Sequence, residues 1–267
     1  MKPIVFFIST FTIIIGITSC EKVIDYNLND STPRYVIEGV LTNQAGQCWV
    51  RVTKSVNFDE SNTFPPISNA LVVISDDLGK NDTLLESATG FYSLPSLKGL
   101  SGVTYKLSVI IDDKSFIAYS TMPVQVNFDS IDFSKISMFG GAQTVPVPVY
   151  KDPEHSNNYY RFVELVNGKK LEAIFVRDDH QSDGRIVRQP LIDFSDNAAN
   201  SGDSICIQMM CIDAGVYEYF FSLSQISGGG QNQTGTPANP ISNISGGALG
   251  YFSAQTIQEK TVLTPKK

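Results

Sequence analysis

The stretch RYVIEGVLTNQAGQCWVRVTKS, residues 34–55, decides the fold class of this chain. Its two arms, residues 34–42 and 47–55, contain several β-branched and aromatic residues, which favour extended strands. The four residues between them, Asn-Gln-Ala-Gly at 43–46, are typical of a hairpin turn. The stretch therefore predicts a β-hairpin.

The second arm of the hairpin also indicates which of its faces is buried. Side chains along it alternate between two faces, and a period of two is that of a strand with only one face in a core. The first face takes Cys48, Val50 and Val52, and the other takes Trp49, Arg51 and Thr53. Such a strand belongs in a sheet that packs on its apolar side.

Five further runs of this kind follow before residue 124, separated by turn residues. They are ALVVISDD (70–77), DTLLES (82–87), GFYSL (90–94), VTYKLSVII (103–111) and SFIAYSTM (115–122). Short strands with regularly spaced turns predict a β-sandwich of immunoglobulin-like size over residues 34–124. The phrases SNALVVISDDLG, TGFYSL and GVTYKLSVIIDD also resemble the carboxypeptidase regulatory-like, or transthyretin-like, sandwich.

The remaining chain, residues 125–267, is predicted to form a second, β-rich domain, so that the fold class is mainly β. Its strand-like runs are ISMFGGAQTVPVPVYKDP (136–153), NYYRFVELVNG (158–168), KLEAIFVRDD (170–179), RQPLIDFSD (188–196), DSICIQMMCID (203–213) and ALGYFSAQTIQEKTVL (248–263). Residues 122–136 are interpreted as a connector. Apolar residues three and four positions apart predict one packed helix over 215–227, and a Gly/Asn/Pro-rich loop follows it.

The first nineteen residues have the parts of an export signal. Lys2 is followed by an apolar run that is short for a membrane span, and the small residues Thr18 and Ser19 precede Cys20. The ending Ile-Thr-Ser-Cys resembles a bacterial lipobox. We expect residues 1–19 to be a lipoprotein signal peptide, Cys20 to be lipidated and residues 20–33 to form a tether. An ordinary cleaved signal with a chance cysteine and a short membrane anchor are the alternatives.

Bulk composition narrows the class of partner. The net charge is −7 and the isoelectric point is about 4.8, which argues against nucleic acid as a partner. Besides Cys20 there are three cysteines, so these can form at most one disulfide. Cys206 and Cys211 lie too far apart on one extended strand to pair with each other, and either could reach Cys48 only through the fold. Buried thiols are the favoured interpretation.

The sequence contains no recognisable catalytic set. The two histidines, His155 and His180, both lie in turn-like segments, and there is no Gly-x-Ser-x-Gly, His-Glu-x-x-His, Cys-x-x-Cys or P-loop motif. We therefore expect a protein that is not an enzyme and that uses no cofactor and no resident metal. A secreted hydrolase is a disfavoured alternative.

An acidic loop and a group of tyrosines are the candidate functional residues. Asp178, Asp179 and Asp183 could offer oxygen ligands to calcium, but their spacing does not match an EF-hand, and a solvated hairpin tip is the favoured interpretation. Tyrosine side chains that point outward can serve as interface anchors or stack on sugars. The candidate interaction residues are Tyr159, Tyr160, Tyr217 and Tyr251. Neighbours such as Tyr159 and Tyr160 must point to opposite faces of a strand.

The order of motifs near the C-terminus resembles a known family. YYRF, then YEYFFSL, then NPISNISGGALGYFSA are similar to the closing segments of a family of Bacteroidetes lipoproteins labelled domain of unknown function 4249. The lipobox, YVIEGVLT and GVTYKLSV fit the same family. The resemblance implies association with TonB-dependent transporters of the outer membrane.

These observations together predict a non-enzymatic lipoprotein of the cell envelope, anchored to the outer membrane and accessory to a TonB-dependent transporter. A surface lipoprotein that binds glycans or peptides is the alternative. The membrane face, the cargo and the oligomeric state are not determined at this level.

Overall fold

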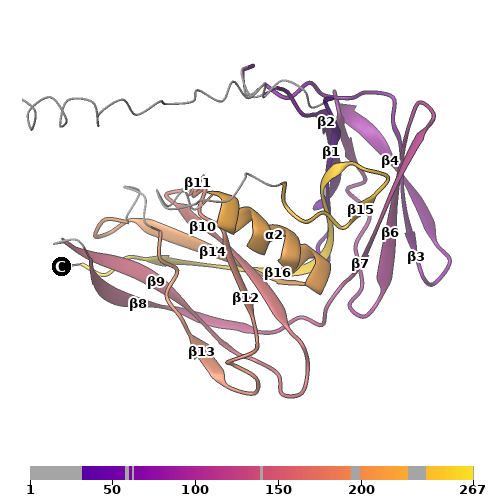
Figure 1. Ribbon diagram of the computed structural model, residues 1–267. Coiled ribbons are helices and arrows are strands. Elements are labelled where there is room, and N and C mark those ends of the chain that lie inside the picture. Colours follow the sequence, from indigo (N-terminus) through magenta and orange to yellow (C-terminus); the bar gives the residue numbers. More distant parts are fainter. Residues whose placement is uncertain are drawn as a thin grey trace, which may run out of the picture. The chain divides into compact units, whose positions relative to one another are not determined.

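The computed structural model describes residues 32–57, 60–61, 63–138, 141–193, 199–227 and 239–266. The predicted signal peptide, Cys20 and most of the predicted tether lie outside this part of the chain. The described residues form β-strands and one helix, α2 (Figure 1). The mainly β fold class with a single packed helix is confirmed.

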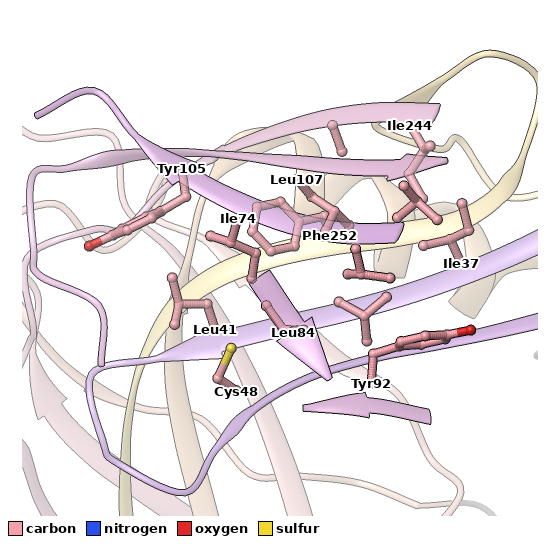
Figure 2. Packing of buried hydrophobic residues seen from close by; sticks show 14 of the residues in the cluster. Ile37, Leu41, Cys48, Ile74, Leu84, Tyr92, Tyr105, Leu107, Ile244 and Phe252 are labelled. Carbon is pink, nitrogen blue, oxygen red and sulfur yellow. The ribbon is translucent and has the colours of Figure 1, made fainter. Parts of the chain in front are cut away.

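The first seven strands match the runs predicted for residues 34–122. They are β1 (Tyr35–Thr42), β2 (Cys48–Lys54), β3 (Leu71–Asp76), β4 (Asn81–Ala88), β5 (Phe91–Ser93), β6 (Thr104–Ile111) and β7 (Lys114–Thr121). In the sheet they follow the order β1-β2-β5-β4-β3-β6-β7. Strand β4 pairs with both β5 and β3 and so joins the two halves of this sheet. Apolar residues of β1 and β2 share one core with those of β3 and β6. Figure 2 shows this sandwich-like core, in which Ile37, Leu41 and Tyr92 are almost fully buried.

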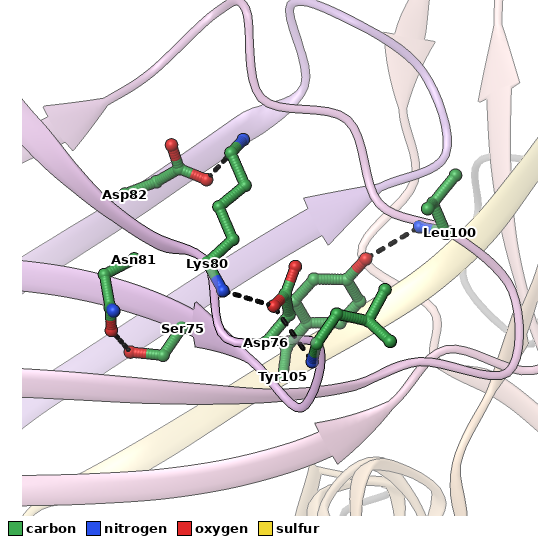
Figure 3. A network of polar contacts seen from close by, with 8 residues as sticks. Ser75, Asp76, Lys80, Asn81, Asp82, Leu100 and Tyr105 are labelled. Carbon is green, nitrogen blue, oxygen red and sulfur yellow. Dashed lines mark hydrogen bonds and ion pairs between the residues drawn. The ribbon is translucent and has the colours of Figure 1, made fainter.

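Asp76 stabilises the turn between β3 and β4. The Asp76 Oδ1 atom accepts hydrogen bonds from the backbone N–H groups of Leu78 at 3.1 Å and Lys80 at 2.8 Å. Beside it, Ser75 bonds to Asn81 across the strands (Figure 3). A carboxylate that accepts bonds from the two following backbone donors fixes a tight turn, and here it sets the register of the hairpin.

The next elements form a second layered group. They are β8 (Phe128–Met138), β9 (Gly141–Lys151), β10 (Tyr159–Val166), β11 (Lys169–Lys170), β12 (Phe175–Asp178), β13 (Ile186–Arg188) and β14 (Ser204–Ile212). Strands β13, β9 and β8 make a separate three-stranded sheet, and β10 and β14 belong to the large sheet. Apolar residues of both sheets, among them Tyr150 and Phe162, share one core.

Two predictions for this half are wrong. The segment interpreted as a connector contains most of β8, and a register shift between Phe128 and Ser130 explains the error. Such a bulge moves Phe128 and Ile131 out of a simple period of two, although both side chains are buried in the same core. The strand predicted over 188–196 has no strand geometry at residues 189–193, and residues 194–198 are outside the described chain.

The last strand, β16 (Leu249–Leu263), joins the two groups of strands. Its first part, Leu249–Gln255, pairs in parallel with β1, and Thr256–Leu263 pairs antiparallel with β14. Phe252 and Ala254 of the first part belong to the same core as β1 to β7. The short strand β15 (Ile244–Ser245) pairs with β7 and adds Ile244 to that core. One sheet therefore runs from β11 through β16 to β15.

Side chains form hydrogen bonds with backbone groups of β16 at the positions where its neighbouring strands end. Next to the end of β1, Asn43 accepts a hydrogen bond from the Ile257 N–H at 3.0 Å, and Gln44 donates one to the Ile257 carbonyl at 3.1 Å. Near the beginning of β16, the Asn243 amide bonds to both the N–H and the carbonyl of Phe252, at 3.0 and 2.8 Å. A strand edge left without such partners would cost free energy and invite aggregation.

Helix α2 (Ala214–Ser227) covers part of the other face of this sheet. Val216 and Phe220 are buried against Met210, Ile212 and Tyr251. Asp213 begins the helix, because its Oδ1 accepts the Val216 N–H at 2.9 Å as an N-cap. The helix predicted over 215–227 is confirmed.

The predicted domain boundary at residue 124 stays a prediction. Residues 33–56 and 61–267 form one compact unit, and β15 and the first part of β16 line the core of β1 to β7. The described part of the chain contains no helix that has the length and hydropathy needed to cross a bilayer.

Candidate ligand-binding groove

The sheet face on which α2 lies also carries a groove. Its volume is about 400 Å³, which is in the range of sites for small ligands. The floor is mostly apolar: Val40, Val163, Met210 and Ile257 lie there beside the buried polar residues Thr42 and Gln255, and charged and aromatic side chains surround it.

The sheet register explains why distant residues meet in this groove. Arg161 of β10 lies opposite Met210 of β14, and Met210 lies opposite Ile257 of β16. On the other side of β16, Glu38 of β1 lies opposite both Tyr251 of β16 and Arg51 of β2. Residues that face each other on neighbouring strands project to the same side, so all of these side chains are on the groove side.

Cations outnumber anions in the described lining. Arg51, Arg161 and Lys170 are accompanied by one carboxylate, Glu38. The Glu38 and Arg51 side chains form an ion pair with 3.3 Å between Oε2 and Nε. The described lining therefore has two more positive than negative charges, and the charge of Glu38 also acts on Arg161 and Lys170, although neither forms an ion pair with it.

Arg161 is the most unusual of these cations. Its guanidinium carbon lies 3.9 Å from the centre of the Phe220 ring, and Nη1 is 4.0 Å from the Met210 sulfur. Within the described chain, no carboxylate pairs with it. Burial lowers the pKa of Arg161, yet a guanidinium keeps its charge at neutral pH. A partly buried cation without an anionic partner favours the binding of an anion.

Lys170 stands at the rim of the groove on β11. Its register partner is Leu165, four residues beyond Arg161 on β10. Desolvation, and after it the positive charge of Arg161, lowers the pKa of Lys170. The two cations are therefore close enough to repel each other but occupy different parts of the groove.

Tyr251 of β16, which lines the groove, packs against Tyr219 of α2. The Tyr219 and Tyr251 ring centres are 4.9 Å apart, and Tyr251 also contacts Phe220. Burial raises the pKa of Tyr251 and raises that of Tyr219 to about 12, so both hydroxyls are neutral. Tyr251 lines the groove, and its hydroxyl can donate to a ligand there, whereas Tyr219 contacts Tyr251 without lining the groove.

Trp49 forms part of the opposite wall. Its ring lies nearly parallel to that of Phe91, with centres 5.8 Å apart, and the Arg51 guanidinium is 6.0 Å from its centre. These contacts keep a large planar surface in place beside the charged residues. The described lining contains no histidine, cysteine or serine, and its chemistry is that of anion binding by charge and hydrogen bonds.

The predicted tyrosines take different positions from those expected of outward residues. Tyr159 and Tyr160 do point to opposite faces, but Tyr160 is fully buried between the two sheets and Tyr251 is 7% exposed. Tyr160 and Tyr251 do not point outward, because α2 and the β13-β9-β8 sheet cover both faces there, and an interaction role for the four tyrosines stays a prediction. Tyr251 nonetheless borders the groove. Tyr217 is partly buried and donates a hydrogen bond to Asp178 at 3.1 Å.

The acidic loop also differs from a solvated hairpin tip. Asp179 and Asp183 meet Asp152, which the sequence did not suggest, and one oxygen of each lies within 4.8 Å of the others. Asp152 and Asp179 are buried, so the solvated interpretation is wrong for Asp179. Asp178 is not part of this cluster. Burial raises the pKa of Asp152, although the Tyr160 hydroxyl that bonds to it opposes the effect.

Protein donors already occupy this acidic cluster. Asp179 accepts the Asn158 N–H at 2.6 Å, and Asp183 accepts the His155 N–H at 2.8 Å. The carboxylates thereby join the two loops on either side, which is a structural role.

The remaining candidate residues show no catalytic arrangement within the described chain. His180 is exposed and paired with Asp178, and His155 is exposed in a turn. Cys48, Cys206 and Cys211 are free thiols. Burial raises the pKa of Cys211 and raises that of Cys48 to about 12, which keeps both unreactive as thiols.

Sequence reasoning missed the groove because its signal is weak. Arg161 interrupts the otherwise mostly apolar run YYRFVELV, and Arg51 shares a strand face with Trp49. A charged residue inside such a strand indicates a candidate binding position. Only the pairing of β1, β14 and β16 brings these positions together.

A protein-family model described as "Domain of unknown function (DUF4249)" matches residues 21–261 of the chain. A search of the curated proteins found no match. The matched segment includes every residue of the groove and begins immediately after Cys20.

Proposed function

Because the chain belongs to the DUF4249 family, we propose that it is a non-enzymatic lipoprotein of the outer membrane that binds a ligand in the groove and assists a TonB-dependent transporter. The observation that carries the binding part is Arg161, a partly buried cation without an anionic partner in the described chain at the edge of an open groove. The transporter part rests on the family resemblance alone.

The lipid anchor is supported by the sequence before the family domain. Cys20 follows an apolar leader that ends in Ile-Thr-Ser, and the family match begins at the next residue. Each buried methylene of an acyl chain contributes about 0.8 kcal/mol, so several chains on one cysteine hold a folded domain at a bilayer. Confinement to one membrane raises the effective concentration of a transporter partner without requiring a tight interface.

A Bacteroidetes origin and a carboxypeptidase regulatory-like first half belong to the same proposal. The order of short strands in β1 to β7 and their shared apolar core support the second of these. A module of this kind would act as a rigid support for the groove, since β1 and β2 belong both to its core and to the groove.

A ligand-binding protein for surface glycans or peptides is the second candidate. The groove favours it, because an apolar floor with aromatic walls and a few charges is typical of small-ligand sites. Both candidates require the same anchor and the same groove, and they differ in whether a transporter receives the ligand.

The anchor and the transporter are tested together in cells. Growth with an alkyne fatty acid should label the wild-type protein and leave Cys20→Ser unlabelled, and affinity purification from solubilised outer membranes should recover a TonB-dependent transporter with the wild type. Equal labelling of Cys20→Ser would overturn the anchor. Recovery of the protein without any transporter, under conditions that keep a known transporter complex intact, would overturn the partnership.

A further inference from the structure

We propose that the groove binds a small dicarboxylate, with Arg161 and Lys170 holding its two ends. The inference deepens the proposed function, because it names the class of ligand for the same groove and rests on that groove being a binding site.

The charge balance of the groove sets the charge of the ligand. Glu38 and Arg51 neutralise each other in an ion pair. Arg161 and Lys170 have no such partner among the described lining residues, which leaves two positive charges. A ligand with two negative charges neutralises both, whereas a monoanion leaves one of them without a partner.

The environment of Arg161 favours a carboxylate at that end. The guanidinium lies against the Phe220 ring, and its other contact is the Met210 sulfur, a weak acceptor. Its N–H groups form a planar fork that matches the two oxygens of a carboxylate. Tyr251, which lines the groove and belongs to the same aromatic cluster, can donate its hydroxyl to the same group.

The spacing of the two cations favours two separate anionic groups over one phosphate. Arg161 and Leu165 are four residues apart on β10, and Lys170 lies opposite Leu165. At about 3.3 Å per residue, the backbones that carry the two cations are roughly 13 Å apart along the strand. Two side chains that start this far apart can reach the two carboxylates of a short carbon chain by converging over Val163, which lies between them in the groove.

The test is a calorimetric titration of the detergent-solubilised full chain with three ligands of nearly equal shape. Glutarate carries two carboxylates, its monoamide carries one, and its diamide carries none. We expect glutarate to bind at least tenfold more tightly than the monoamide, the diamide to give no measurable binding, and added sodium chloride to weaken binding. Equal binding of all three ligands would overturn the proposal, as would inorganic phosphate binding as tightly as glutarate.

Variants assign the binding to the groove. Arg161→Gln should weaken glutarate binding more than tenfold and Lys170→Gln several-fold, while Arg188→Gln, an exposed arginine paired with Asp132 outside the groove, should leave it unchanged. Arg161→Met removes a charge without an anionic partner, so its Tm should stay at or above that of the wild type. Unchanged glutarate affinity in a folded Arg161→Gln variant would overturn the role of this residue. Fatty-acid labelling and transporter recovery are independent of these titrations, so failure of the ligand class and failure of the proposed function are separate results.

Discussion

At the scale of single residues, Glu164 makes stability depend on pH. It is 4% exposed, between the two sheets, and burial together with the charge of Asp193 raises its pKa from 4.5 to about 7. The folded protein therefore keeps this proton while the unfolded chain loses it, so its contribution is complete below about pH 4.5 and is lost as the pH rises to 7. Deprotonation of Glu164 should lower the free energy of unfolding by roughly 3 kcal/mol in total.

The change that tests this is Glu164→Gln, which is neutral at every pH. Its free energy of unfolding, measured with urea between pH 5 and 8, should fall less with pH than that of the wild type, and should exceed the wild-type value at pH 8. Glu172→Gln, an exposed carboxylate nearby in the chain, should follow the wild-type curve. Parallel curves for Glu164→Gln and the wild type would contradict the assignment.

Gly250 is a second residue with a specific requirement. Its φ is +99°, and a Cβ atom there would overlap the Ile37 carbonyl oxygen of the paired strand. Gly250→Ala should lower the free energy of unfolding by about 3 kcal/mol or more, because the backbone of Ile37 cannot move away from the added Cβ as a flexible side chain could. Gly247→Ala is the matched control, since its φ is +86° and no atom lies within 4 Å of the added Cβ. We expect the control to cost about 1 kcal/mol, and similar losses of Tm in both variants would argue against the close approach.

At the scale of elements, Asp213 links α2 to the first sandwich. One carboxylate oxygen caps the helix at the Val216 N–H, and the other accepts bonds from the Ser120 hydroxyl and the Thr121 N–H of β7. Asp213→Ala should destabilise the protein by about 2–4 kcal/mol in chemical denaturation, since both the cap and the link are lost. Glu218→Gln, on the exposed side of the same helix, should change stability by less than about 0.5 kcal/mol. A loss below 1 kcal/mol for Asp213→Ala would indicate that water replaces these bonds.

Elements were predictable where local periodicity was regular. The alternation in residues 47–55 and the spacing of Val216 and Phe220 predicted β2 and α2 within one or two residues. Strand β8 was missed because a bulge after Phe128 breaks the alternation. Asp213 was missed as a cap because the sequence places it at the end of a strand-like run, and only its three hydrogen bonds distinguish it.

At the scale of the whole molecule, β16 ties the C-terminal segment to the first core. Phe252, Ala254 and Ile244 are buried among residues of β1 to β7, although more than a hundred residues separate them from β7. A fragment of residues 33–124 would therefore lack part of its core and expose the β1 edge to aggregation. We expect this fragment to show no cooperative thermal unfolding by circular dichroism.

A linked fragment provides the control for that experiment. Residues 239–256 joined to 33–124 by a flexible linker restore Phe252 and the parallel partner of β1, and should recover a cooperative transition. A sharp transition in the short fragment, at the Tm of the linked one, would show that residues 34–124 are an independent domain after all.

Local sequence was sufficient for most of the strands, the helix and the family motifs, because period and turn chemistry act over a few residues. The roles of Gly250 and Asn243 in NPISNISGGALGYF, which are close approach to β1 and edge hydrogen bonds at β16, needed the tertiary structure. The groove and the acidic cluster needed the tertiary structure. Glu38 meets Tyr251, and Asp152 meets Asp179, only through pairing and burial between distant segments. Such registers depend on how the whole chain buries its apolar surface, which no single stretch encodes.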